Sequence, residues 1–321
     1  MAQSESYQNF YLNLQDELDL FTPDSLLGDK IWGLTTLSVS NIRSKPQHSS
    51  ELVSQVTMGT PVKLIEETEG WIRLETPEGY NGWMDSSGLK RLTAEDLILW
   101  KSLNRFVFNR ISGYLLSAPN RKGKIVSDLV LGDIFVVNSE KIGFFEISTP
   151  DGRKGFVHKK ECISWEDWIG RKPDVNALLS VALQMVGSPY LWGGTSVKAV
   201  DCSGLVKLAY FSQAIVLERD ASQQALCGDS VDFRNLKNLL PGDLLFFGTS
   251  PQKIVHVGIY LGNSAYIHAS GLVRINSIDS LVQNYNLSEN KNLVEARRIL
   301  NSLNTEGIVQ VKYHPWYNVL P

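Results

Sequence analysis

The chain has 321 residues, of which 43% are hydrophobic and 20% charged, and its formal net charge is −3. This length suffices for two or three domains with separate cores. Without a basic excess, nucleic acid and anionic membrane surfaces are poor candidates as principal partners. No stretch approaches the roughly 18 apolar residues of a membrane-spanning helix. Three cysteines form too sparse a set for a disulfide framework.

The first 30 residues are predicted to be an N-terminal helical segment, because Phe10, Leu14 and Leu18 recur at helical spacing. The opening MAQSESYQNF has neither the basic nor the apolar region of a secretory signal. We therefore expect a cytoplasmic location, or a cell-envelope or periplasmic one if a leader has been removed from the chain.

A repeat follows, in which two segments align at an offset of 73 residues; TPEGYNGW at 76–83 matches TPDGRKGF at 149–156 without a gap. Each copy alternates short β-rich runs with turns that contain proline and glycine, a pattern typical of small antiparallel barrels. We predict β domains at residues 31–93 and 104–164, with TAEDLILWKSL as a helical linker between them.

Beyond Trp168 the pattern becomes helical: DVNALLSVALQMVG carries one apolar stripe and ends at a glycine. Asp201-Cys202-Ser203-Gly204 then precedes a second apolar helix. Asp201 is a predicted N-cap, which leaves Cys202 in the first turn. The helix dipole and free amides at that position favour a thiolate, so we expect a lowered pKa for Cys202 and a nucleophilic role.

Two histidines follow in VHVGIYLGNSAYIHAS, which is predicted to be a hairpin. His256 and His268 lie six residues on either side of Gly262, so a turn centred there places them opposite each other on one face. They could supply a base and its orienting partner. Taken singly, each could instead be a hydrogen-bonded core residue. A zinc site with Cys202 is also possible, but no HExxH or CxxC pattern supports it, so we predict no metal or cofactor.

The other candidate side chains are interpreted as structural. Cys162 and Cys227 are expected to be incidental or structural thiols, and His48 and His158 to lie at the surface. Residues 301–321, which include the fifth histidine, are predicted to form a C-terminal tail for which the sequence indicates no role.

The segments GSPYLWGG, DCSG, PGDLLFF, HVGIYLG and YIHAS resemble, in this order, those of NlpC/P60 cysteine peptidases. The two repeats resemble bacterial SH3 (SH3b) domains through NIRSKP and GYNGWM; the second copy has YLLSAP and GRKGFV instead, which favours a structural role. The resemblance implies an α+β fold, with a papain-like catalytic domain at residues 170–300 behind two SH3-like β-barrels. It implies that Cys202 is the nucleophile, His256 the base and His268 its orienting residue, with Tyr190 positioning the thiolate or oxyanion.

SSELVSQ and ERDASQQ resemble sequences of a subgroup with two SH3b domains, the γ-D-glutamyl-L-diamino acid endopeptidases. In that subgroup an acid and a tyrosine of the first barrel, with the aspartate beside the cysteine, hold the free amine of an N-terminal L-alanine. The candidates here are Glu51, Tyr80 and Asp201. Further substrate-binding residues implied by the resemblance are Ser203, Trp192, Asp220 and Ser222.

The repeat offers an internal comparison, because Glu51 aligns with Lys124 and Tyr80 with Arg153. Only the first barrel could therefore bind an ammonium group in this way. The implied substrates are peptidoglycan-derived peptides such as L-Ala-γ-D-Glu-diamino acid, with lysine or diaminopimelate left open, and a monomer is favoured. The alternatives are a D,L-endopeptidase or amidase that acts on intact peptidoglycan, and a non-catalytic wall-binding protein.

Overall fold

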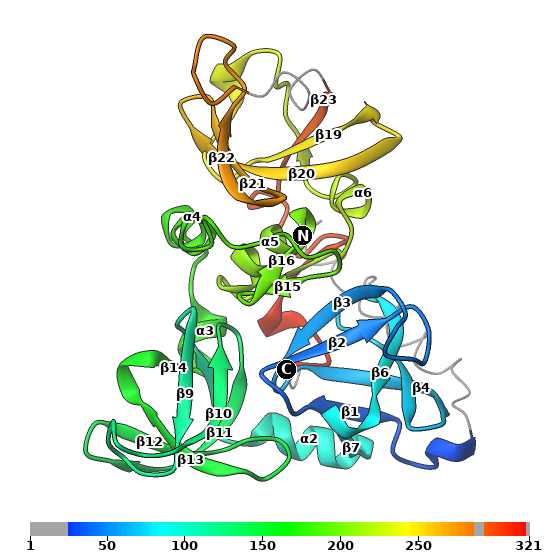
Figure 1. The fold of residues 1–321 in the computed structure, drawn as a ribbon, viewed down its shortest axis with the longest axis vertical. Coiled ribbons are helices and arrows are strands. Elements are labelled where there is room, and N and C mark those ends of the chain that lie inside the picture. Colours follow the sequence, from blue (N-terminus) through cyan, green and yellow to red (C-terminus); the bar gives the residue numbers. More distant parts are fainter. Residues whose placement is uncertain (1–24, 286–291, 319–321) are drawn as a thin grey trace, which may run out of the picture.

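The computed structural model describes residues 25–285 and 292–318, and the helix predicted around residues 10–18 lies outside them. Figure 1 shows two small β units in the first half of the chain and a mixed helix and sheet unit in the second. None of the helices in these described parts combines the length and the apolar character needed to span a bilayer.

The two β units are copies of one seven-stranded antiparallel barrel. The first contains β1 (Trp32–Thr35), β2 (Val39–Arg43), β3 (Leu52–Thr57), β4 (Pro61–Thr68), β5 (Trp71–Glu75), β6 (Asn81–Asp85) and β7 (Leu89–Leu92). The second contains β8 (Arg105–Phe108), β9 (Ser112–Leu116), β10 (Ile125–Val130), β11 (Ile134–Lys141), β12 (Phe144–Ser148), β13 (Lys154–His158) and β14 (Cys162–Ser164). Every strand of the second copy starts 73 residues after its counterpart, and the strand orders β3-β2-β6-β5-β4-β1-β7 and β10-β9-β13-β12-β11-β8-β14 are equivalent. The predicted repeat is confirmed as two barrels.

The predicted linker helix is α2 (Ala94–Ser102). It begins with a capping box in which the side chains of Thr93 and Asp96 each accept a hydrogen bond from the other residue's backbone amide. A second short helix, α3 (Trp165–Gly170), follows the second barrel and leads into the third unit.

The third unit packs helices against an antiparallel sheet. Its helices are α4 (Val175–Gln184), α5 (Cys202–Phe211) and α6 (Ala221–Gln224). The sheet has the order β18-β23-β19-β20-β21-β22, formed by β18 (Asp229–Ser230), β23 (Leu293–Arg298), β19 (Leu244–Ser250), β20 (Lys253–Gly262), β21 (Ala265–Ser270) and β22 (Leu272–Ser277). A short ladder, β15 (Thr195–Ser196) with β16 (Ala199–Val200), precedes α5. Helix α5 contacts β20 and β21, and its buried face joins the main core, which confirms the α+β class and the helix on the sheet.

The C-terminal segment is part of the fold as far as the structure describes it. Strand β24 (Ile308–Gln310) pairs with β17 (Ile215–Leu217), which follows α5. Trp316 and Tyr317 are buried in a core that both barrels and the third unit share. The Trp316 ring lies 5.2 Å from that of Trp32 in the first barrel. Burial of these aromatic side chains stabilises the assembly of all three units, a structural role for this segment that the sequence did not indicate.

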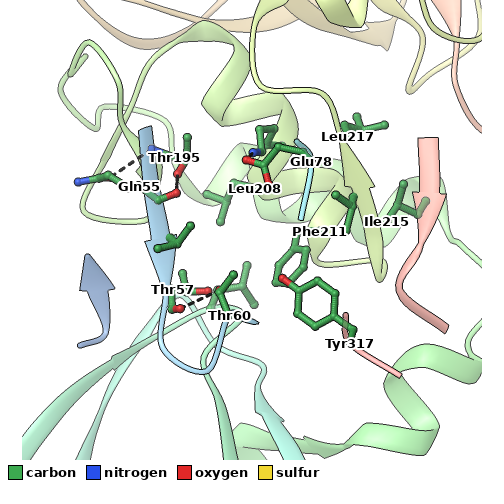
Figure 2. Close-up of a pocket in the computed structure, with 14 residues that line it drawn as sticks. Gln55, Thr57, Thr60, Glu78, Thr195, Leu208, Phe211, Ile215, Leu217 and Tyr317 are labelled. Atoms are coloured by element: carbon green, nitrogen blue, oxygen red, sulfur yellow. Dashed lines mark hydrogen bonds and ion pairs between the residues drawn. The ribbon is translucent and has the colours of Figure 1, made fainter. Parts of the chain in front are cut away.

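A buried ion pair also connects the first barrel to the third unit. The Glu78 carboxylate, on the turn between β5 and β6, accepts a hydrogen bond from Lys207 of α5. Figure 2 shows Glu78 near Leu208 at the small cavity between these units. The repeat-equivalent Asp151 instead pairs with Arg153 of its own turn, at 2.7 Å. The same turn position therefore serves as an interdomain contact in the first copy alone.

We expect Glu78→Gln to lower the free energy of unfolding by about 3 to 5 kcal/mol, because it leaves the buried Lys207 ammonium without its countercharge. Asp151→Asn, the matched change in the second barrel, is expected to cost about 1 kcal/mol or less because its ion pair is partly exposed. Urea denaturation of both variants measures the difference. Equal destabilisation by the two changes would show that the interdomain pair has no special weight.

Candidate active site

The nucleophile candidate begins helix α5 as predicted. Asp201 is the N-cap, and its Oδ1 accepts a hydrogen bond from the Gly204 amide at 2.7 Å. Gly204 has no alternative here, since a Cβ atom at this position would lie 1.9 Å from the carbonyl oxygen of Gly194. Cys202 is 8% exposed, and its sulfur lies within hydrogen-bonding reach of the amides of Ser203 and Val257. The local sequence thus fixes the thiol at the meeting point of helix and sheet.

The expected lowering of the Cys202 pKa is wrong for the free site. Burial raises the pKa of this thiol to about 11, and the neighbouring Asp201 carboxylate adds to the increase. The amides of Ser203 and Val257 act in the opposite direction but do not compensate. Desolvation of a charged sulfur outweighs the helix dipole because the Cys202 side chain is buried.

The two histidines lie on one hairpin, but its register differs from the prediction. The turn consists of Asn263 and Ser264, both with positive φ, rather than being centred on Gly262. His268 therefore pairs with Gly258. His256 lies two residues before Gly258 in β20, on the same face. A Cβ atom on Gly258 would approach the His268 Cβ atom to 3.2 Å, so this glycine leaves room for the two rings to meet diagonally.

The hydrogen-bond network assigns the tautomers of the pair. His256 Nε2 lies 2.8 Å from His268 Nδ1, and His268 Nε2 lies 2.8 Å from Asn276 Oδ1. The Asn276 amide nitrogen donates to the carbonyl of Asn284, so its oxygen must accept from His268. Neutral His268 then accepts from His256 through Nδ1. This leaves Nδ1 of His256 as the basic nitrogen available to a reacting group.

The pKa of His256 is lowered to about 3, first by burial and then by the nearby His268. With a thiol pKa near 11, both members of the nucleophile and base pair are neutral at pH 7 in the free site. Such a pair works by general-base catalysis, in which the thiol gives up its proton as it attacks. Burial of Cys202 and His256 disfavours a resting pair of thiolate and imidazolium.

Alkylation kinetics test this protonation state. Below pH 11 the thiolate fraction of Cys202 grows about tenfold per pH unit, because the free-site pKa is raised. We expect its iodoacetamide rate to rise steadily from pH 6 to pH 9, measured by mass spectrometry of the peptide that carries Cys202. A rate that is flat between pH 5 and pH 8 would instead indicate a preformed ion pair.

A cavity of 380 Å³ opens in front of Cys202. It brings together Cys202, the predicted positioning residue Tyr190, and all seven predicted substrate-binding residues: Glu51, Tyr80, Trp192, Asp201, Ser203, Asp220 and Ser222. Burial raises the pKa of Tyr190 to about 12, so its hydroxyl keeps the proton that it can donate to a thiolate or oxyanion. The roles of Tyr190 and of the seven substrate-binding candidates remain predictions. These residues are distant in sequence and come from two domains, yet they line one cavity.

The first barrel forms one wall of this cavity through β3 and the residues around it. Glu51 Oε1 accepts a hydrogen bond of 2.7 Å from the indole nitrogen of Trp192, which belongs to the loop before α5. Gln55 binds the next part of that loop, because its side-chain oxygen accepts from the Thr195 amide at 3.1 Å. Gly193 sits directly against Leu52, where a Cβ atom would lie 2.3 Å from the carbonyl oxygen. The barrel is thus docked rigidly beside the nucleophile.

Arg219 is a residue of the site that the sequence analysis did not single out, although it lies inside ERDASQQ. Its Nη2 donates to Asp201 Oδ2 at 2.6 Å, its Nη1 to Ser203 at 2.9 Å, and its Nε to Ser54 of the first barrel at 3.1 Å. It is 2% exposed. This guanidinium therefore joins the N-cap of the cysteine helix to the barrel wall.

The carboxylate of Asp201 is already engaged by its surroundings. Besides Arg219 and the Gly204 amide, Oδ2 accepts from the Gly193 amide at 3.0 Å. Direct contact of Asp201 with a substrate amine stays a prediction, and its capping and positioning role is what the geometry displays. Asn276 was also absent from the predicted set, because only the β21–β22 register reveals its contact with His268.

The remaining candidates lie apart from the cavity lining. Burial raises the pKa of the thiols of Cys162 and Cys227, which suits structural cysteines. His48 is largely exposed and His158 half-buried, whereas His314 is buried and bonds the Pro77 carbonyl at 2.8 Å. Within residues 25–285 and 292–318, no cluster of three His, Cys, Asp or Glu side chains is arranged to hold a metal ion.

Comparison with known proteins agrees with this geometry. The NlpC/P60 family matches residues 187–295, and the bacterial SH3 domain matches residues 37–90. A probable endopeptidase NlpC of Escherichia coli is 38% identical over 145 residues, which are 40% of this chain and 88% of that protein. The chain belongs to the NlpC/P60 family.

Two further relatives of this NlpC/P60 chain extend over the barrels. A γ-D-glutamyl-L-lysine dipeptidyl-peptidase of Bacillus cereus is 27% identical over 234 residues, which are 69% of this chain and 68% of the relative. The crystal structure of an NlpC/P60 family protein from Bacillus cereus superposes with a TM-score of 0.72 at 21% identity. It covers 84% of this chain and 99% of its own, which shows that the fold with two SH3b-like barrels before a papain-like domain is shared.

Proposed function

We propose that this chain is a cysteine peptidase that hydrolyses the γ-D-glutamyl-L-diamino acid bond of peptidoglycan-derived peptides with a free N-terminal L-alanine. The observation that carries the proposal is the placement of Glu51 and Tyr80 from the first barrel in the cavity of Cys202. The name of the Bacillus cereus relative, a γ-D-glutamyl-L-lysine dipeptidyl-peptidase, supports the same substrate class.

The charge of the cavity supports recognition of an ammonium group. Three carboxylates line it, those of Glu51, Asp201 and Asp220, against the single guanidinium of Arg219. Arg219 pairs with Asp201 at 2.6 Å and lies 3.9 Å from the Asp220 carboxylate, so the carboxylates outnumber their cation and Glu51 has no cationic partner among the residues that line the cavity. Oε1 of Glu51 accepts a hydrogen bond from Trp192, so Oε2 is available to a substrate amine. The Tyr80 ring can pack against the same ammonium group.

The reaction follows from the assigned protonation states. As Cys202 Sγ bonds to the amide carbonyl carbon, its proton passes to Nδ1 of His256, and His268 with Asn276 stabilises the imidazolium. The oxyanion lies where the Ser203 amide and the Tyr190 hydroxyl can donate to it. The imidazolium then protonates the departing amine, and the C–N bond breaks to leave a thioester. Water, deprotonated by His256, hydrolyses that thioester and restores the thiol.

The Glu51 carboxylate is the element to test. We expect Glu51→Gln to lower kcat/KM for L-Ala-γ-D-Glu-diaminopimelate by about 10 to 100-fold, the value of one charge-assisted hydrogen bond. Trp192→Phe, which retains an aromatic side chain but removes the N–H donor to Glu51, should raise KM with less effect on kcat. The assay is product release followed by mass spectrometry.

Glu66→Gln supplies the matched control, because Glu66 lies in the same barrel, pairs with Arg73 at the surface and does not line the cavity. We expect it to leave kcat/KM unchanged. Should Glu51→Gln behave like Glu66→Gln, the amine would be recognised elsewhere or not at all, and a peptidase for intact peptidoglycan becomes the better description.

A further inference from the structure

The second barrel has a cavity of its own, of 340 Å³, between β9, the start of β12 and the end of β13. It shares no residue with the cavity of Cys202. We call it the basic cavity, and its lining includes Arg110, Arg121, His158, Lys160, Tyr114 and Phe144. The internal repeat shows how this surface differs from its counterpart in the first barrel.

In the first barrel the equivalent place is occupied by a pair of side chains. His48 lies 3.6 Å from the Asp85 carboxylate, and its ring packs edge-on against Trp71 with a centroid distance of 4.9 Å. The 73-residue offset puts Arg121 at the position of His48 and His158 at that of Asp85. A pair that attracts in one copy is therefore replaced by two groups that cannot pair in the other.

Further basic residues come from the same comparison. Arg110 stands where the first barrel has Leu37, and Lys160 stands where it has Ser87. Among the described residues none of Arg110, Arg121 and Lys160 forms an ion pair with a carboxylate, although Glu161 also lines the cavity. Three cationic side chains and one carboxylate thus line the same hollow.

Local contacts orient these groups. Arg110 Nη2 donates to the Lys160 carbonyl at 2.9 Å, which leaves the other guanidinium donors available. His158 Nδ1 accepts from the Lys160 amide at 3.2 Å, so the neutral ring carries its proton on Nε2. Phe144 lies edge-on to His158, and Tyr114 is 53% exposed. The cavity combines hydrogen-bond donors of positive charge with an apolar aromatic surface.

We propose that the basic cavity is an anion-binding site, which takes a carboxylate or phosphate group carried on a small organic body. Arginine side chains bind both groups through paired N–H donors, and the volume matches that of small-ligand sites. Tyr114 and Phe144 contact the body of the ligand. The second barrel is then a ligand-binding module in addition to its structural role.

Titration of the full chain with inorganic phosphate and, separately, with succinate tests the site, followed by backbone amide NMR shifts and calorimetry. We expect saturable shifts confined to residues 110–121, 144 and 158–161. The probe that binds more tightly identifies phosphate or carboxylate as the natural group. Absence of saturable shifts with both probes, or shifts spread over the whole surface, would overturn the proposal.

Two double variants give the specificity control. Arg121→Ala with Lys160→Ala should weaken the affinity for the better probe at least about tenfold, since it removes two charge-assisted contacts. Lys122→Ala with Lys124→Ala removes the same charge from exposed positions that do not line the cavity, and should leave the affinity within about twofold. Equal weakening by both double variants would mean diffuse surface attraction and would refute a defined site.

A third variant installs the arrangement of the first barrel. Arg121→His with His158→Asp recreates the pair seen at His48 and Asp85, and an aspartate caps the following turn at this position in the first barrel. We expect a folded protein, with an unchanged melting temperature, that no longer binds the probe. Retained binding in this variant would contradict the role of Arg121 and His158.

Discussion

Cys202→Ala is expected to lower kcat for L-Ala-γ-D-Glu-diaminopimelate by about 10⁴-fold or more, because the covalent route depends on the sulfur. The change removes one buried atom and leaves the Asp201 cap in place, so the helix should persist. Peptide affinity, measured by calorimetry, should change little, while turnover, measured by mass spectrometry, disappears.

Cys227→Ala is the matched control for this prediction. That cysteine is also buried and belongs to the same domain, but it does not line the cavity of Cys202. We expect full activity from it. Turnover by Cys202→Ala within tenfold of the unmodified protein would exclude the sulfur as the nucleophile.

Arg219→Met should both destabilise and inactivate the protein. It leaves the Asp201 carboxylate buried without its cation, at a cost of about 3 to 5 kcal/mol of unfolding free energy. The freed carboxylate would then shift the N-terminal turn of α5 and the Ser203 amide that faces the oxyanion. Urea denaturation and kcat together measure the two effects.

Arg91→Met removes a comparable bidentate partner, because Arg91 pairs with Glu67 on the first barrel, where both side chains are partly exposed. It is expected to cost about 1 kcal/mol or less and to leave kcat unchanged. If the two variants lost the same stability, the buried pair would not be the link between barrel and nucleophile that its contacts indicate.

The repeat, the N-cap at Asp201 and the meeting of His256 with His268 could be predicted because each depends on local spacing. Turn residues and apolar periodicity determine barrels and helices over short stretches of chain. The position of the hairpin turn was wrong by one residue. Positive φ at Asn263 and Ser264 decides it, and the glycine next to them is an equally good turn residue in sequence.

Arg219, Asn276 and the C-terminal segment escaped prediction for a different reason. The contacts of Arg219 and of the C-terminal segment join units far apart in the chain, and the contact of Asn276 depends on the register of two neighbouring strands. No periodic pattern in the sequence records either kind of pair. The raised pKa of Cys202 was not predicted either. The sequence indicates the start of the helix, but it does not indicate the burial that determines the pKa of this thiol. The basic cavity of the second barrel, which was expected to be structural, escaped prediction because only the fold brings Arg110, Arg121 and Lys160 around one hollow.

The central claim is that the first barrel selects peptides with a free amine, and one measurement tests it most directly. The purified chain is incubated under reducing conditions with L-Ala-γ-D-Glu-diaminopimelate and with its N-acetylated form, and kcat/KM is determined for each. We expect release of L-Ala-D-Glu from the free-amine peptide, with kcat/KM at least about tenfold lower for the acetylated one. Equal values for the two peptides would contradict it.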